Sequence, residues 1–398
     1  MEYCSNYINL NNIAFTIERN GESMVQVNEK RLIHQFFELV QIDSETKNEY
    51  KIAKYLKEKF QTLGLKVKED DSKEKTGHGA GNLICDLEGD EKYDSIFFTA
   101  HMDTVTPGQN IKPILKNGYV VSDGSTILGA DDKAGLAALI EFIHLLNENN
   151  VHHGPIQIII TVGEESGLVG SKHLNPTLIK AKYGYALDSD GAVGDIVVQA
   201  PAQAKILTKI KGKAAHAGVA PEKGISAITV AAKAVSKIPL GKIDEETTAN
   251  IGYFKGGQEQ TNIVCDYVEI LAEARSLSEE KLRKQINVMK DLFEKNAHEY
   301  GAHAEITVNK MYPSFHYKKS DQVVKIAYEA AKSIGRESSF ITSGGGSDAN
   351  IFSSYGIPTV NLAVGYEEIH TTNERIALSN LVQIPSFLIA IVQQSLFN

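Results

Sequence analysis

Three short apolar runs, each ending in polar residues, constrain the fold of this chain more than any other feature. The runs are DSIFFTAHMD, GPIQIIITVG and KYGYALD, and each predicts a buried strand. Helical spacing of apolar residues precedes them at 27–42 and 48–63, and DDKAGLAALIEFIHLLNENN predicts a helix between the first two. Because strands and helices alternate through about residue 200, we expect an α/β domain with a mixed, largely parallel sheet flanked by helices.

The middle of the chain has a different pattern. The β-α-β-β-α-β order predicted there has strands at 203–211, 246–254, 266–274 and 303–309 and helices at about 221–238 and 278–299. This order is typical of a ferredoxin-like α+β domain. The α/β pattern then resumes with helices near 320–334, 347–354 and 374–396 and strands at 338–342 and 358–364. We therefore predict an extension at 1–26, a main domain from 27–202 and 312–398, and an inserted domain at 203–311.

Composition excludes several classes of protein. The chain has 50 Asp and Glu against 41 Lys and Arg, and this acidic balance argues against general nucleic-acid binding. Its three cysteines, Cys4, Cys85 and Cys265, are too far apart for a disulfide framework or a Cys-rich zinc site, so we expect a cytoplasmic protein. The sequence has no apolar run of about 18 residues and no signal-peptide pattern at its N-terminus, so no membrane association is expected.

Polar motifs follow the predicted strands, and sites in open α/β sheets form at the carboxyl ends of strands. In His101-Met102-Asp103, residues i and i+2 face the same way, so Asp103 can accept a hydrogen bond from His101 and orient it as a ligand. Alone, such a motif is more often a strand-end His beside a carboxylate. In GADDKAG, helix capping explains one acidic residue, whereas a carboxylate such as Asp131 can also bridge two cations.

The remaining motifs add carboxylates and a second histidine. Glu164 and Glu165 directly follow the strand IQIIITV, where two adjacent charges are costly unless they are paired or metal-bound. Asp188-Ser189-Asp190 ends another strand, and His370 precedes the last helix. A set of two His and several carboxylates without Cys suits a pair of zinc, manganese or cobalt ions.

With these motifs in order, the chain resembles a family of dinuclear metallohydrolases. This family contains peptidase T, carboxypeptidase G, acetylornithine deacetylase and succinyl-diaminopimelate desuccinylase. The segments FFTAHMDTV, GADDKAG and TVGEESGLVGS carry the resemblance, which spans about 27–398 and favours the peptidase T branch. It implies a zinc exopeptidase-like catalytic domain and an inserted lid and dimerisation domain.

The resemblance also implies roles for single residues. One metal would be held by His101, Asp131 and Asp188, and the other by Asp131, Glu165 and His370. Asp188 is preferred to Asp190 because it directly follows the apolar strand. Glu164 would be the general base, which passes a proton from the attacking water to the leaving amine. Asp103 would support His101, and the peptide bond after Asp131 is expected to be cis, as in relatives.

The inserted domain would complete the site. By resemblance, His216 stabilises the oxyanion, often from the partner subunit of a dimer, although its local sequence indicates only a turn His. Asn262 and Arg275 would grip the substrate, with a surface salt bridge as the alternative for Arg275. Gly345 lies in SGGGSD, which lacks the GK[ST] ending of a phosphate loop and is expected to form a tight turn along the substrate cleft.

These implications favour a homodimeric aminotripeptidase with two divalent metal ions per subunit, zinc in the first place and manganese or cobalt as alternatives. An N-acyl amino acid amidohydrolase or carboxypeptidase would use the same chemistry, and a non-catalytic binding protein could use the same scaffold. An aminopeptidase needs an acceptor for the substrate ammonium, for which the candidates are Glu367, Glu368 and Asp348.

Overall fold

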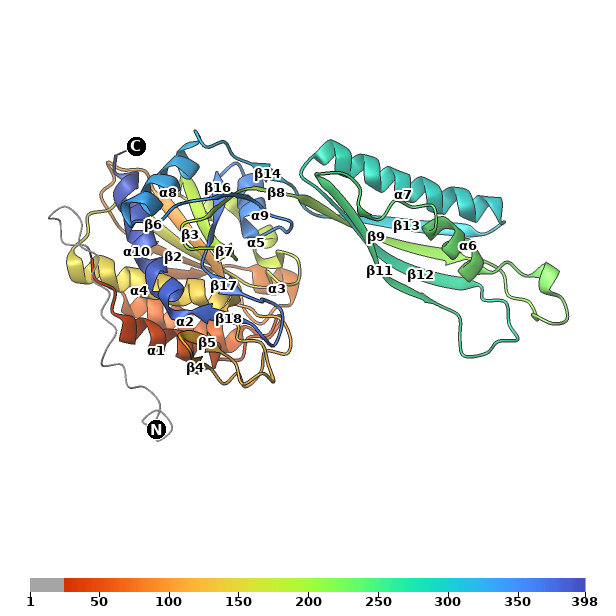
Figure 1. Cartoon of the computed structure of the whole chain (residues 1–398), viewed down its shortest axis with the longest axis horizontal. Helices are drawn as coiled ribbons and strands as arrows, with labels where there is room; N and C mark the ends of the chain where they lie inside the picture. The colour runs from red at the N-terminus through yellow and green to blue at the C-terminus, as the bar shows by residue number, and fades with distance from the viewer. Residues whose placement is uncertain (1–24, 398) are drawn as a thin grey trace. The chain divides into compact units, whose positions relative to one another are not determined.

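The computed structural model describes residues 25–397, which form two compact units (Figure 1). Unit 1 comprises 25–196, 319–340 and 357–397, and unit 2 comprises 197–318 and 341–356. Most of the predicted extension at 1–26 lies outside the described residues. The segment 341–356 clusters with unit 2, whereas the sequence pattern alone grouped it with the main domain.

Unit 1 is built on a mixed sheet whose centre is parallel. Its strands run in the order β1 (Lys66–Glu69), β2 (Leu83–Leu87), β6 (Ile156–Thr161), β3 (Ile96–His101), β7 (Tyr183–Ser189) and β16 (Thr359–Ala363). The pairs β6–β3, β3–β7 and β7–β16 are parallel, and β1–β2 and β2–β6 are antiparallel. Every residue of β3, β6 and β16 is buried, which explains why these strands appear in the sequence as unbroken apolar runs.

Helices flank this sheet, as the sequence predicts. They are α1 (Glu29–Val40), α2 (Tyr50–Thr62), α3 (Ser72–Thr76), α4 (Ala130–Asn149), α5 (Val169–His173), α8 (Gln322–Ser333) and α10 (Leu378–Ser395). Helix α4 packs against β3, β7, α1 and α10. Because other elements surround α4, most of its residues are buried and it is apolar on nearly all sides.

A small antiparallel sheet, which the sequence patterns did not predict, completes unit 1. Its strands run in the order β17 (Tyr366–Glu367), β18 (Arg375–Ala377), β5 (Tyr119–Val121) and β4 (Ile114–Lys116). Strands of two or three residues are too short to show a period of two. The sheet matters for the site because β17 and β18 pair directly and hold the intervening loop, which contains His370.

Unit 2 contains a separate antiparallel sheet of five strands. Their order is β10 (Gly241–Lys242), β11 (Thr247–Gly256), β12 (Tyr267–Ser276), β9 (Ala202–Lys211) and β13 (His303–Tyr312). Helices α6 (Ala227–Val235) and α7 (Glu279–Glu299) pack against this sheet around an apolar core. The element order matches the predicted ferredoxin-like domain, with β10 as an extra edge strand. The remaining elements are β8 (Ile196–Ala200), β14 (Phe315–His316), β15 (Phe340–Thr342) and α9 (Asp348–Ser354).

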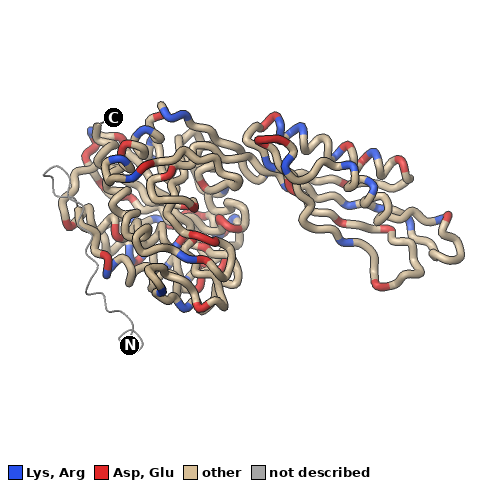
Figure 2. Tube along the Cα trace, in the orientation of Figure 1, with Lys and Arg blue, Asp and Glu red and all other residues tan. Residues whose placement is uncertain are grey.

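The fold-class prediction is confirmed by a mostly parallel sheet with helices and a separate antiparallel domain. Helix α6 begins later than expected because Ser226 caps it, accepting a hydrogen bond from the N–H of Thr229. Acidic and basic residues alternate along the chain of α7 (Figure 2). Between residues 25 and 397, no helix has the length and apolar character that crossing a membrane requires.

Candidate metal centre

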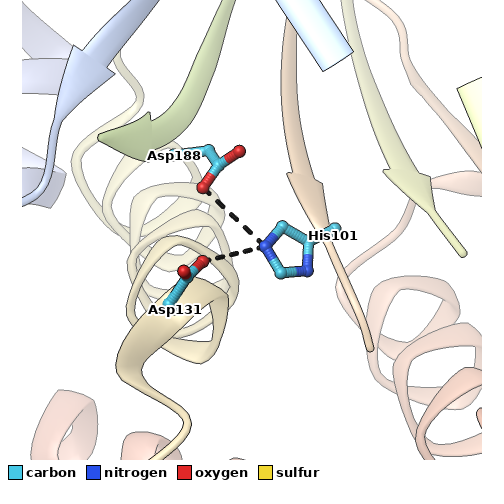
Figure 3. A group of neighbouring side chains, drawn as sticks. All are labelled: His101, Asp131 and Asp188. Carbon is cyan, nitrogen blue, oxygen red and sulfur yellow. Dashed lines mark hydrogen bonds and ion pairs between the residues drawn. The ribbon is translucent and has the colours of Figure 1, made fainter. Parts of the chain in front are cut away.

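The parallel strands of unit 1 bring His101, Asp131 and Asp188 together (Figure 3). His101 is the last residue of β3, Asp188 lies near the end of the neighbouring strand β7, and Asp131 lies at the start of α4. His101 Nε2 is 2.9 Å from Asp131 Oδ1 and 3.7 Å from Asp188 Oδ1. The three side chains therefore meet at the carboxyl edge of the sheet, where sites in open α/β folds form.

The second carboxylate oxygen of Asp131 faces another histidine. His370 Nε2 is 3.2 Å from Asp131 Oδ2 and 3.0 Å from Glu165 Oε1. The donor atoms of Asp131, Glu165 and His370 all lie within 4.8 Å of one another, as do those of His101, Asp131 and Asp188. Asp131 thus belongs to two adjacent groups of candidate ligands, with one oxygen turned toward the histidine of each.

Glu164 lies at the same centre. A carboxylate oxygen of Glu164 lies within 4.8 Å of donor atoms of His101 and Glu165, and the side chain is buried. Its main-chain N–H donates to Asp103 Oδ1 over 3.0 Å, and Asp103 Oδ2 accepts a hydrogen bond from Thr46 Oγ1 over 2.7 Å. The Asp103 carboxylate therefore orients the segment that carries Glu164.

The contact between His101 and Asp103 differs from the expected one. His101 Nδ1 is 3.0 Å from the main-chain oxygen of Asp103, while the carboxylate oxygen is 3.6 Å away. Because a carbonyl oxygen can only accept, Nδ1 carries a hydrogen, and Nε2 is left as the ring nitrogen that faces the carboxylates of the centre. The predicted support of His101 by Asp103 thus runs through the backbone.

Burial and charge shift the pKa values of the cluster. Burial lowers the pKa of His101, but Asp103, Asp131 and Asp188 outweigh it and hold that pKa well above its usual value. The carboxylates of Asp131 and Glu165 raise the pKa of His370 to about 10. Burial, followed by the charge of Asp131, raises the pKa of Asp188 to about 7. So many buried acids are costly unless cations neutralise them.

The chemistry of these donors fits divalent cations. Imidazole nitrogen and carboxylate oxygen converge from five segments of unit 1 with no thiolate among them, a set that zinc, manganese and cobalt accept. The peptide bond between Asp131 and Asp132 is cis, as expected from the resemblance. His370 has a positive φ of 62°, which is uncommon for residues other than Gly and tends to cluster at functional sites.

Asp188 and Asp190, the two alternatives for one ligand, occupy different surroundings. The Asp188 carboxylate accepts a hydrogen bond of 3.0 Å from the buried Tyr366 hydroxyl, and its main-chain N–H donates to Asn361 Oδ1 over 2.9 Å. Asp190 lies beyond the end of β7 and is exposed. The geometry favours Asp188 as the ligand.

The sequence patterns did not indicate a role for three further buried residues. Tyr366 contacts Asp188, Glu374 accepts main-chain hydrogen bonds near Asp131, and Lys133 Nζ donates to the carbonyl oxygens of Leu39 and Ile42 over 3.3 and 3.5 Å. Burial lowers the pKa of Lys133 to about 8 and raises that of Glu374 to about 7. A charged residue inside a polar motif carries no signal of its own burial, because long-range packing causes it.

The other predicted residues lie in unit 2 and form two local pairs. His216 and Asn262 occupy neighbouring turns, joined by a 2.9 Å hydrogen bond from the Ala217 N–H to the Asn262 oxygen, and both are exposed. Arg275 Nη1 donates to the Gly344 oxygen over 3.3 Å, next to Gly345. Arg275 Nε also contacts Glu273 Oε1 at 2.9 Å, so the salt bridge considered as its alternative exists.

Comparison with known proteins adds independent support. The model of Peptidase family M20/M25/M40 matches residues 97–394, which are most of the chain. The chain belongs to this peptidase family. The match includes every metal-ligand candidate of unit 1. The predicted family is therefore confirmed, and the chain is a member of the M20 metallopeptidases.

Several relatives match this M20 peptidase over nearly its whole length. A crystal structure of aminopeptidase PepT from Bacillus cereus is 60% identical, covers 93% of this chain and 99% of its own, and has a TM-score of 0.87. A tripeptidase structure from Staphylococcus aureus is 50% identical, with coverages of 94% and 100% and a TM-score of 0.90. The uncharacterized protein YqjE of Bacillus subtilis is 62% identical over 369 residues, 93% of this chain and 99% of that protein.

Proposed function

We propose that the chain is a metal-dependent aminotripeptidase that removes the N-terminal residue of short peptides. The observation that carries the proposal is Asp131, whose two oxygens each face the imidazole of a different ligand group. The names of the relatives, an aminopeptidase and a tripeptidase at 60% and 50% identity, support the choice of substrate.

His101, Asp131 and Asp188 would hold one cation, and Asp131, Glu165 and His370 the other. Bound divalent cations supply polarisation of the scissile carbonyl and a lowered pKa for the attacking water. Zinc is our first choice because its preferred ligands are the nitrogen and oxygen donors present here. Manganese and cobalt remain alternatives for the same donors.

Glu164 would move the proton. Its carboxylate lies beside His101 and Glu165 and is largely sheltered from solvent, while its backbone is held by Asp103. A carboxylate held in this way can accept the proton of the attacking water and deliver it to the leaving amine. Neither His101 nor Glu165 is free to do this if both act as ligands.

The ammonium group of a free peptide requires a carboxylate acceptor. Glu367 is already paired with Arg375, whose Nε and Nη2 lie 2.7 and 2.6 Å from its carboxylate. Glu368 is exposed, and Asp348 lies buried at the start of α9 in unit 2. The pairing makes Glu367 a weaker candidate than the exposed Glu368, and Asp348 stays an alternative acceptor.

A panel of peptides tests the proposed substrate. The reconstituted protein should cleave free-amine tripeptides faster than di- or tetrapeptides, and N-acetylated tripeptides should remain intact. Preference for the acetylated forms would instead indicate an amidohydrolase, and cleavage from the carboxyl end would indicate a carboxypeptidase. Binding of all peptides without turnover would indicate a non-catalytic protein on this scaffold.

We also propose that unit 2 mediates a cytoplasmic homodimer. The sheet face turned away from α6 and α7 exposes Tyr253, Tyr267 and Leu271 at 39, 40 and 45%. Tyr253 and Leu271 lie directly opposite each other on β11 and β12, so they form one apolar area. Light scattering should give twice the chain mass, and Leu271→Glu should shift the measured mass toward that of the monomer.

The role of His216 as oxyanion donor stays a prediction. A loss of kcat in His216→Ala would support it.

A further inference from the structure

The loop between β17 and β18 carries a buried carboxylate, Glu374, four residues after His370. We propose that Glu374 is a positioning residue that fixes Asp131 relative to His370 and so sets the affinity of the cation that these two residues share. This inference rests on the proposed two-cation site and deepens it.

Glu374 holds the segment that leads into Asp131 with both of its oxygens. Oε2 accepts hydrogen bonds from the main-chain N–H groups of Leu128 and Gly129 at 2.8 and 2.7 Å, and Oε1 accepts one from the N–H of Asp131 at 3.0 Å. The side chain is only 1% exposed. Hydrogen bonds from main-chain amides to a buried carboxylate are charge-assisted and strong.

The N-cap residue of α4 cannot replace these contacts. A helix is usually capped by the side chain of its own N-cap residue, but that residue is Gly129 here, with a φ of 73°. Asp131 and Asp132 also depart from helical geometry, with ψ angles of 101° and 36°. Helical hydrogen bonding alone therefore does not fix the Asp131 backbone, and Glu374 supplies the acceptor for its N–H from 243 residues along the chain.

The backbone of Glu374 closes a turn at 371–374, which directly follows His370. Its N–H donates to the Thr371 oxygen at 3.2 Å, and Thr371 Oγ1 donates to the Glu368 oxygen at 2.7 Å. His370 lies between Glu368 and Thr371, in the left-handed region. One residue thus grips the Asp131 segment with its side chain and the His370 segment with its main chain.

This arrangement predicts a defined effect of removing one acceptor oxygen. In Glu374→Gln, the single amide oxygen can serve either the Leu128 and Gly129 amides or the Asp131 amide. The NH₂ group then faces the remaining donor or donors, which cannot hydrogen-bond to it. The Asp131 carboxylate should shift with its backbone. The distance from Asp131 Oδ2 to His370 Nε2, 3.2 Å in the wild-type chain, should change as a result.

The test compares full-length Glu374→Gln and Glu374→Asp with a matched control, Glu141→Gln. Glu141 is, like Glu374, a buried carboxylate. It lies in α4 and accepts hydrogen bonds from the Asn28 N–H and from Arg31 Nε, in the contact with α1. Each apoprotein is titrated with Co²⁺ by calorimetry and by visible absorption, and kcat and KM are measured on a tripeptide.

We expect Glu374→Gln to weaken one of the two Co²⁺ binding steps about 10–100-fold, the range typical for residues that orient ligands. Its Co²⁺ spectrum should change, and kcat should fall more than KM rises. Glu374→Asp keeps both oxygens on a shorter chain and should lie between this variant and wild type. Glu141→Gln should lower Tm while leaving both affinities and the spectrum unchanged.

Wild-type affinities and spectrum in a folded Glu374→Gln protein would overturn the inference and leave the proposed function intact. If Glu374→Gln does not fold, Glu374→Asp decides, since wild-type binding of both ions by that variant overturns the inference equally. Failure of the wild-type protein to bind a second Co²⁺ would instead refute the two-cation site itself.

Discussion

The main-chain N–H of Glu164 donates a 3.0 Å hydrogen bond to the carboxylate of Asp103. The side chain of Asp103 therefore positions the proposed general base, while its carbonyl oxygen, 3.0 Å from Nδ1, orients His101. A single residue thus supports a proposed metal ligand through its backbone and the proposed base through its side chain. These two functions can be separated by substitution.

The variant Asp103→Ala removes the carboxylate but keeps the carbonyl. We expect kcat for tripeptide hydrolysis to fall roughly 100-fold, because the base loses its orientation, whereas the protein still binds metal. Asp103→Asn keeps one oxygen for the Glu164 N–H and should retain more activity. Kinetics and metal analysis of both variants provide the test. If Asp103→Ala lost metal and showed no separate defect in kcat, the backbone and the side chain of Asp103 would not have the two different functions proposed here.

Glu164→Gln keeps the size of the side chain and removes the base. Because Glu164 is not one of the proposed ligands that share Asp131, the variant should retain two metal ions per chain. Its kcat should fall about 10²–10⁴-fold, the usual contribution of general acid–base catalysis. Elemental analysis beside steady-state kinetics checks both statements, and a variant as fast as wild type would eliminate Glu164 as the base.

Metal binding at neutral pH should release protons. Asp131 and Glu165 raise the pKa of His370 to about 10, so the imidazole of the apoprotein carries a proton at pH 7 that a cation must displace. Asp188, with its pKa raised to about 7, contributes a further fraction of a proton. Metal affinity should consequently rise with pH up to about 10, and most steeply below about 7, where Asp188 also carries a proton.

Calorimetry in two buffers of different ionisation enthalpy measures this release. The apparent binding enthalpy should differ between the buffers, and His370→Ala should reduce the difference. Identical enthalpies in both buffers would mean that the histidine is already neutral, contrary to the effect of its two carboxylate neighbours.

The neighbouring acids Asp188 and Asp190 offer a matched pair. Asp188 lies among the buried donors and contacts Tyr366, while Asp190 is exposed beyond β7. Asp188→Asn should therefore weaken the binding of one cation at least tenfold, and Asp190→Asn should leave both cations bound. The reverse pattern in metal titrations would assign the ligand to Asp190.

The sequence was most informative where local pattern decides structure. The apolar runs before His101 and Glu164 correctly predict β3 and β6, because central parallel strands are buried on both faces. The carboxyl-edge rule then explains why His101, Asp131 and Asp188 meet.

Contacts between distant segments could not be predicted in this way. Glu374 reaches residues about 245 positions away, and nothing in NERI distinguishes it from a solvated acid. Strands β17 and β18 are stabilised by pairing with each other and with β5 and are too short to show a pattern. The backbone contact of His101 with Asp103 likewise depends on the turn after β3, which residue spacing alone does not define.

The most direct test of the account is a titration of metal-free protein with Co²⁺, in which bound cobalt and hydrolysis of a free-amine tripeptide are measured in the same samples. We predict no turnover without metal, and activity that reaches its plateau as two ions bind per chain. Full turnover by the metal-free protein, or a plateau with fewer than one ion per chain, would contradict the two-cation aminotripeptidase proposed for this fold.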